Sequence, residues 1–166
     1  MKRLARAFAT VFGVGLLRPA PGTWGSLAAL PLALGLQELG DFPVFIMATA
    51  AIFILGIYAT ELATAGSHDH DPSEIVIDEV AGQLIALLPL SFAATRMGVP
   101  MAAMWPGWIA AFVLFRAFDI LKPGPVGWAD RRKDATGVML DDAIAGIFAA
   151  IGVLLLAALF HLVIMR

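Results

Sequence analysis

Charged residues divide the chain into long runs that are uncharged and mostly apolar. Residues 42–60, 97–115 and 143–165 contain no Asp, Glu, Lys or Arg, and each run is close to the ~20 residues that a helix needs to cross a membrane. Residues 80–95 form a shorter uncharged run, which crosses if its polar ends reach the interface. Residues 19–37 form another. The pattern predicts an all-α, polytopic membrane helix bundle of about five transmembrane or partly membrane-embedded helices.

The run over residues 19–37 differs from the others because it contains several helix-disrupting residues. Pro19, Pro21, Gly22 and Pro31 all lie within it, and proline inside a helix removes a hydrogen bond and bends the axis. We therefore expect a short or kinked helix here. A re-entrant segment and a full crossing are both left open.

Composition supports a lipid environment. The chain has 166 residues, of which 60% are hydrophobic and 14% charged, whereas soluble domains carry roughly 25% charged residues. This length suits a single domain over residues 1–166. The net charge of −2 gives no reason to expect nucleic acid as a partner. The absence of cysteine excludes disulfides, thiolate metal sites and cysteine nucleophiles.

The distribution of basic residues predicts the orientation. With five crossings, nine of the eleven Lys and Arg residues fall on one side of the membrane, and only Arg96 and Arg166 fall on the other. The nine are Lys2, Arg3, Arg6, Arg18, Arg116, Lys122, Arg131, Arg132 and Lys133. Because basic loops stay inside, this side should be cytoplasmic.

Acidic residues gather on that same side, although the orientation rule does not require it. Of thirteen Asp and Glu residues, only Glu38 and Asp41 fall outside. We interpret Glu61, Asp130 and Asp134 as an ordinary solvated surface. The other inner acids indicate a functional site at the cytoplasmic face.

The first candidate segment runs from His68 to Glu79, as a polar loop that enters a helix. Asp78 and Glu79 stand at the start of that helix, where the helix dipole favours negative charge. Gln83 shares the face of Glu79 one turn later. Helix capping by Asp78 would explain one carboxylate well, but two adjacent ones less well. Ionisable groups at membrane depth are usually functional.

The second candidate segment lies at the end of the fourth apolar run. Arg116, Asp119 and Lys122 are spaced three apart, so they fall near one face of a helix. An interfacial Arg–Asp pair with a snorkelling lysine is the ordinary alternative. The closeness of Asp119 to the apolar run favours a functional role.

The third candidate segment contains a second carboxylate pair. Asp141 and Asp142 open the last apolar run, and adjacent residues on a helix point about 100° apart. One of them should face the bundle while the other caps the helix. Ala143, Ala145 and Gly146 are small enough for a neighbouring helix to approach closely.

A glycine-containing segment precedes the first apolar helix, and it contains Gly22, Thr23, Gly25 and Ser26. Free backbone N–H groups before a helix N-terminus can bind phosphate. Thr23 and Ser26 are therefore candidate substrate phosphate-binding residues. A simple N-cap by either of them is an equally good interpretation.

These segments should converge, because they come from helix ends at one depth. Asp78, Glu79, Asp119 and Asp142 are the candidate metal ligands. Hard oxygen ligands suit Mg²⁺, with Mn²⁺ as the alternative. Such an ion polarises a phosphoryl group and lowers the pKa of an attacking water.

The remaining groups suit the other needs of phosphoryl chemistry. Arg116 and Lys122 are candidates to bind the charge of a phosphate. The general base is a carboxylate, Asp78 or Asp141, or else His70. The sequence leaves open which of these acts.

The motifs also resemble the phosphatidylglycerophosphatase A family. The resemblance rests on segments that follow in order along nearly the whole chain. They are Phe12-Gly13-Val14-Gly15-Leu16, Pro21-Gly22-Thr23-Trp24-Gly25-Ser26, His68-Asp69-His70, Ile75-Val76-Ile77-Asp78-Glu79, Phe115-Arg116 with Asp119 and Lys122-Pro123, and Met139-Leu140-Asp141-Asp142 with Ala145-Gly146.

The resemblance implies an all-helical, Mg²⁺-dependent phosphatase of the bacterial inner membrane. Its phospholipid substrate would be phosphatidylglycerophosphate, and its products phosphatidylglycerol and phosphate. Homo-oligomerisation is left open. The alternative function is an ion or proton transporter that uses membrane-embedded carboxylates. Transporters place such groups near mid-span, whereas the acids here lie at the ends of the apolar runs.

Overall fold

The computed structural model describes residues 1–67 and 72–163, and within these ranges it is helical with no β-strand. The helices are α1 (Lys2–Ala9), α2 (Pro21–Thr64), α3 (Ile77–Met97), α4 (Trp105–Leu121), α5 (Pro125–Asp130) and α6 (Ala135–Val163), with short 3-10 helices η1 (Val14–Leu16) and η2 (Met101–Met104). The prediction of an all-α fold is confirmed.

Within residues 1–67 and 72–163, four helices are long and apolar enough to cross a membrane, namely α2, α3, α6 and α4 taken together with η2. In the most apolar stretch of α3, 67% of the residues are buried, against 22% in α2, 17% in α4 and 28% in α6. Helix α3 is therefore the centre of the bundle, and it packs against the other three. The exposed apolar faces of α2, α4 and α6 suit a lipid environment. The chain forms a helical membrane bundle.

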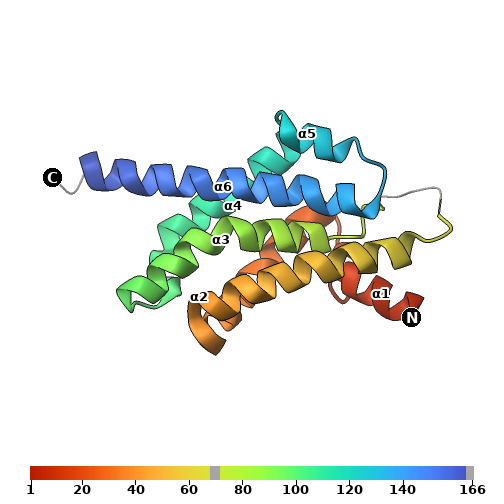
Figure 1. Cartoon of the computed structure of the whole chain (residues 1–166), viewed down its shortest axis with the longest axis horizontal. Coiled ribbons are helices and arrows are strands. Elements are labelled where there is room, and N and C mark those ends of the chain that lie inside the picture. Colours follow the sequence, from red (N-terminus) through yellow and green to blue (C-terminus); the bar gives the residue numbers. More distant parts are fainter. Residues whose placement is uncertain (68–71, 164–166) are drawn as a thin grey trace.

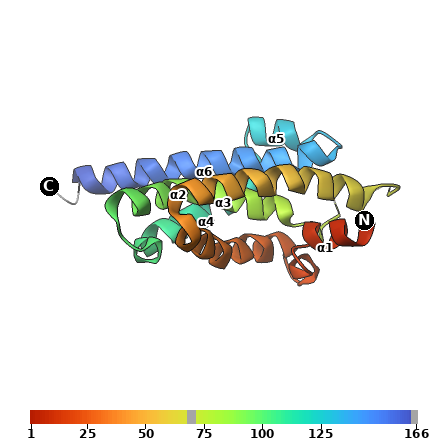
Figure 2. The same ribbon diagram turned by 60° about the horizontal axis from the view of Figure 1, so that its bottom comes forward.

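Helix α2 contains two of the predicted segments, because it folds back on itself (Figures 1 and 2). The helical conformation breaks at Gly40 and at Asp41, whose φ is 55°. The Oγ of Thr95, on α3, accepts a hydrogen bond from the N–H of Phe42 at 3.0 Å and another from Gln37 at 2.9 Å. The first bond satisfies the N–H group of Phe42, where the second half of α2 begins. Together the two bonds attach the turn within α2 to α3. The five predicted segments thus lie in four helices.

The prediction of a span over residues 97–115 is wrong in its bounds. Helix α3 continues to Met97 and ends at Gly98, which adopts the left-handed conformation with φ 62°, as is common where helices end. At the other end, α4 runs on to Leu121 and includes Arg116 and Asp119. These two side chains form an ion pair, so the helix continues past the uncharged run.

The expectation that Asp141 and Asp142 open their helix is also wrong. Helix α6 starts at Ala135, and Asp134 precedes it. An oxygen of Asp134 accepts the backbone N–H of Gly137 at 2.6 Å, as an N-cap does. This bond and the Arg132 ion pair hold the pKa of Asp134 below its usual value. The carboxylate pair therefore lies about two turns inside α6.

Small residues bring α3 and α6 together, as the sequence predicted. A Cβ added to Gly146 would collide with the backbone oxygen of Gly82, and a Cβ on Gly82 would lie 2.7 Å from the backbone oxygen of Asp142 and closer still to Phe115. The two backbones therefore touch where they cross. This close packing of α6 on α3 places Asp142 next to the first turn of α3.

The polar segments share one end of the bundle. Figures 1 and 2 show α1, the connection between α2 and α3, and the start of α6 at one end. The turn within α2, η2 and the C-terminal end of α6 lie at the other. The ends of α2, α3, α4 and α6 that carry the predicted site residues thus meet on one side.

Candidate active site

A cavity of about 160 Å³ lies where the polar ends of the helices meet. It is lined by Pro21, Gly22, Ser73, Ile75, Asp78, Glu79, Asp119, Lys122, Asp141 and Asp142. Five of the ten are carboxylates, and they come from α3, α4 and α6. The predicted convergence of these helix ends is therefore present in the structure.

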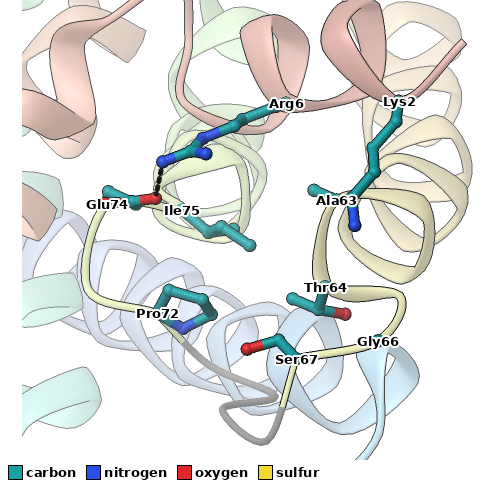
Figure 3. A pocket seen from close by; sticks show the side chains of 9 residues that line it. All are labelled: Lys2, Arg6, Ala63, Thr64, Gly66, Ser67, Pro72, Glu74 and Ile75. Carbon is teal, nitrogen blue, oxygen red and sulfur yellow. Dashed lines mark hydrogen bonds and ion pairs between the residues drawn. The ribbon is translucent and has the colours of Figure 1, made fainter.

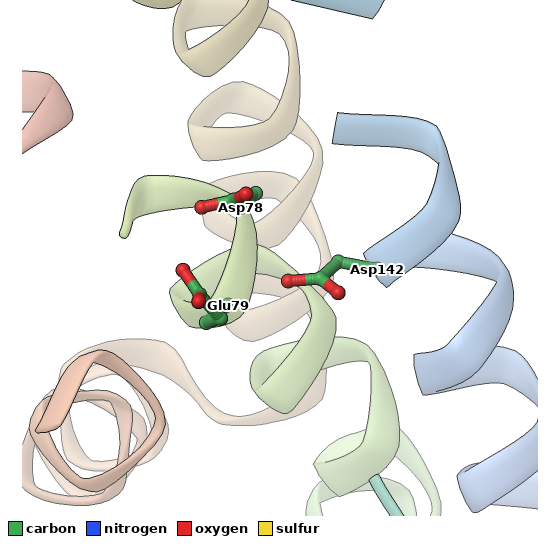
Figure 4. A group of neighbouring side chains, drawn as sticks. All are labelled: Asp78, Glu79 and Asp142. Atoms are coloured by element: carbon green, nitrogen blue, oxygen red, sulfur yellow. The ribbon is translucent and has the colours of Figure 1, made fainter. Parts of the chain in front are cut away.

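Three carboxylates form the centre of this cavity (Figure 4). Oxygens of Asp78, Glu79 and Asp142 all lie within 4.8 Å of one another. Asp78 and Glu79 stand in the first turn of α3, and Asp142 reaches them across the Gly82–Gly146 crossing. Asp142 is only 3% exposed. We call these three residues the carboxylate trio.

Two members of the carboxylate trio, Glu79 and Asp142, each have an oxygen that lacks, among the described residues, the hydrogen-bond donor that buried carboxylates usually have. One oxygen of Glu79 and one of Asp142 are buried and accept no hydrogen bond from a described residue. Negative charges this close repel each other strongly in a buried setting. The arrangement therefore fits a divalent cation, which would satisfy the oxygens and offset the charge.

Asp119 forms one wall of the site and pairs with Arg116, which lies behind it. Arg116 Nη1 lies 2.5 Å from an oxygen of Asp119 and donates to the Oγ of Ser26 at 3.4 Å. Arg116 Nε is buried and has no acceptor among the described residues. Asp119 lines the cavity but does not belong to the carboxylate trio.

Lys122 forms the opposite wall, just after the end of α4. Its ammonium group donates to Asp141 at 2.8 Å and to Asp130. Burial lowers the pKa of Lys122, but these two hydrogen bonds outweigh burial and raise the pKa above its ordinary value. Lys122 therefore stays charged. Asp130 is exposed, as the sequence predicted, and it also pairs with this lysine.

Sequence comparison places this site within a known family. A sequence model of phosphatidylglycerophosphatase A matches residues 7–157. The chain belongs to the phosphatidylglycerophosphatase A family. The matched region contains every residue that lines the cavity.

Curated relatives of the chain agree with this membership. A phosphatidylglycerophosphatase A of Haemophilus influenzae is 41% identical over 141 residues, covering 84% of this chain and 80% of the relative. The Escherichia coli protein of the same name is 34% identical over 141 residues, with 84% and 75% covered. A Bacteroides thetaiotaomicron protein, provisionally named phosphatidylinositol-3-phosphatase, is 38% identical over 147 residues, with 86% of each covered. No solved structure matches the chain.

In this phosphatidylglycerophosphatase A family member, not every predicted residue reaches the cavity. Thr23 is half-buried in the first turn of α2 and does not line it. Ser26 is fully buried, donates to the backbone oxygen of Gly22 at 2.9 Å and accepts from Arg116. Neither residue caps α2, because that helix begins at Pro21 after an N-cap at Ala20. His70 lies outside the described residues.

The cavity also contains residues that the sequence did not single out. Ser73 lines it and accepts a hydrogen bond from Arg18 at 3.3 Å. A Cβ added to Gly22 would collide with the carboxylate of Glu79 and lie 3.2 Å from Arg116, so a larger residue there would displace the Glu79 carboxylate. The Gly-rich segment drew attention to Gly22, but no local pattern marked Ser73 as part of the site.

Proposed function

We propose that this protein removes the terminal phosphate of phosphatidylglycerophosphate, giving phosphatidylglycerol and inorganic phosphate, with Mg²⁺ or Mn²⁺ as cofactor. Membership of the family supports a lipid phosphatase acting in phospholipid metabolism. The observation that carries the proposal is the buried carboxylate trio, flanked by Arg116 and Lys122, at one end of a membrane bundle.

Asp78, Glu79 and Asp142 would hold the metal, because all three offer oxygens within one small, buried volume. Asp119 is placed to contribute from the cavity wall. When bound, the ion would polarise the phosphoryl group and lower the pKa of an attacking water. A carboxylate site with no thiolate or described imidazole ligand suits Mg²⁺ or Mn²⁺ rather than a softer metal.

The chain's own cations would bind the phosphate. Arg116 lies next to Gly22 and Asp119, which line the cavity, and Ser26 holds its guanidinium through Nη1. Lys122 contributes a fixed positive charge at the other wall. Gly22 lies in the first turn of α2, where unpaired N–H groups favour anions, and its missing side chain leaves room for the Glu79 carboxylate.

Hydrolysis also requires proton transfer. Water forms a new bond to phosphorus while the bond to the glycerol oxygen breaks, and that oxygen gains a proton. Asp141 and Asp78 line the cavity and are the candidate groups to take the proton from water. Lys122 fixes one oxygen of Asp141 at 2.8 Å. His70 stays a prediction as the alternative base.

The carboxylates lie near the N-terminal ends of α3 and α6 and near the C-terminal end of α4. This placement favours chemistry at the membrane surface over transport across it, which was the alternative function. The excess of basic residues at the same end supports a cytoplasmic active site in the inner membrane of a bacterium.

Cysteine labelling tests the orientation, because the chain contains no cysteine of its own. Ala65, next to the α2–α3 connection, and Ala102, in η2 at the opposite end, are both exposed. Ala65→Cys should react with an impermeant maleimide only after the cytoplasmic side is opened. Ala102→Cys is the matched control and should react in intact spheroplasts. The reverse pattern would contradict a cytoplasmic site.

Phosphate release from a panel of lipids tests the proposed activity itself. Purified protein in mixed micelles with Mg²⁺ should hydrolyse phosphatidylglycerophosphate at least ~10-fold faster than phosphatidylinositol 3-phosphate, a discrimination of about 1.4 kcal/mol. Mass spectrometry should identify phosphatidylglycerol as the product. The opposite preference would assign another lipid to this site, and no release from any lipid phosphate would overturn the function.

A further inference from the structure

Lys122, which lines the cavity, and Arg116, which lies beside it, are already paired with carboxylates of the chain. Lys122 binds Asp130 and Asp141, and Arg116 binds Asp119. A lipid with two phosphate groups places its second phosphate outside a cavity of about 160 Å³. That second anion would need a cation at the mouth.

Arg18 stands at this mouth. Its Nη1 donates to the Oγ of Ser73 at 3.3 Å, and Ser73 lines the cavity beside Pro21 and Gly22. The arginine is exposed, and none of the ion pairs among the described residues involves it. Within this part of the chain, its other guanidinium N–H groups are therefore free to donate to a ligand. A planar guanidinium can bind two oxygens of one phosphate.

The neighbours of Arg18 place it at the depth of lipid headgroups. Phe12 is 84% exposed and Leu16 59% exposed, and such apolar side chains next to a cation suit the boundary between hydrocarbon and water. Trp24 is 40% exposed and donates from its ring nitrogen to the backbone oxygen of Pro19 at 3.1 Å. Tryptophan is enriched at this boundary. The phosphodiester groups of phospholipids lie at the same level.

We propose that Arg18, positioned by Ser73, binds the phosphodiester of the lipid substrate while the cavity holds its terminal phosphate. The inference rests on the proposed function and adds a determinant of substrate class. Arg18 would select lipids that carry a phosphodiester between the acyl chains and the terminal phosphate. A lipid with a single phosphate gives this arginine nothing to bind.

A second cavity offers other cations, but they are already engaged (Figure 3). It has a volume of about 470 Å³ and is lined by Lys2, Arg6 and Glu74, among others. Arg6 pairs with Glu74 at 2.6 Å, and Lys2 donates to the backbone oxygen of Ala65 at 2.6 Å. Neither cation borders the cavity that contains the carboxylate trio. Arg18 is therefore the better partner for a phosphate next to that cavity.

Steady-state kinetics on phosphatidylglycerophosphate in mixed micelles test this role. Arg18→Gln should raise KM about 10-fold, because one charge-assisted contact is lost, and kcat should stay within about 2-fold because the reacting phosphate is unaffected. The inhibition constant of inorganic phosphate should not change, since phosphate occupies only the inner site. Arg18→Lys should recover part of the loss, and Ser73→Ala should raise KM by about 3-fold.

Arg3→Gln is the matched control, because it removes an exposed arginine from the same end of the bundle and should leave KM unchanged. An unchanged KM in Arg18→Gln would overturn the inference. So would equal increases in KM and in the inhibition constant of phosphate, which would place Arg18 at the inner site. If the wild-type protein releases no phosphate from this lipid, the proposed function fails, and the role of Arg18 with it.

Discussion

Glu79→Gln and Asp142→Asn are each expected to lower kcat for phosphate release at least ~100-fold, the usual effect of losing one strong electrostatic contact in a transition state. Each change keeps the size of the side chain and removes one charge from the carboxylate trio. Asp119→Asn should have a similar effect, because Asp119 lines the same cavity and orients Arg116. The measurement is the initial rate in mixed micelles at saturating lipid.

The thermal stability of the same variants separates catalysis from folding. Without metal, the carboxylate trio brings negative charges together in a buried position, so an amide at Glu79 or Asp142 should leave the Tm unchanged or raise it. Loss of activity with a retained or higher Tm would support a catalytic role. A fully active, normally folded Asp142→Asn variant would contradict it.

Two acids outside the cavity provide matched controls for these variants. Glu61 is exposed on α2, and Asp134 caps α6. Glu61→Gln and Asp134→Asn should change the rate less than ~3-fold, as screened surface charges do, and asparagine is itself a good N-cap. Asp130 is unsuitable as a control, because it binds Lys122 at the cavity wall.

Chelation by EDTA is expected to abolish phosphate release, and excess Mg²⁺ should restore it. The reason is the same buried cluster, in which three carboxylates share one small volume and oxygens of Glu79 and Asp142 accept no hydrogen bond from a described residue. Mn²⁺ should also restore activity, because it accepts similar oxygen ligands. Metal binding should raise the Tm as well, since the ion binds only the folded protein.

EDTA saturated with Mg²⁺ before addition is the control for a direct effect of the chelator on the micelles or the protein. It should leave the rate unchanged. Full activity in an excess of free chelator would rule out a metal-dependent mechanism, and the carboxylate trio would then need another explanation.

Much of this site could be predicted from the sequence. Asp78, Glu79 and Asp142 stood out because ionisable groups beside long apolar runs are costly unless they serve a purpose. The shared depth of the helix ends predicted their convergence, and the cavity confirms that they meet. The small residues of α6 predicted the close approach to α3, which the Gly82–Gly146 contact shows.

Other features depend on contacts that no local pattern encodes. Ser73 reaches the cavity because Glu74 and Val76, which follow it, pack against η1 and the first turns of α2. Lys122 forms ion pairs with Asp130 of α5 and Asp141 of α6. These contacts depend on how α5 and α6 pack against the end of α4. Helix α4 starts later than the uncharged run predicts, because α3 continues to Met97 and η2 precedes Trp105.

The central claim is that Asp78, Glu79 and Asp142 bind the metal that hydrolysis requires. Mn²⁺ binding to purified protein, followed by electron paramagnetic resonance of the free ion, tests it without reference to activity. The wild-type protein should bind Mn²⁺ saturably, and Mg²⁺ should displace it. Asp142→Asn should weaken Mn²⁺ binding at least ~10-fold, because even residues that only support metal ligands typically cost that much affinity when they are changed. Equal Mn²⁺ binding by the wild-type protein and Asp142→Asn would contradict a metal site at the carboxylate trio.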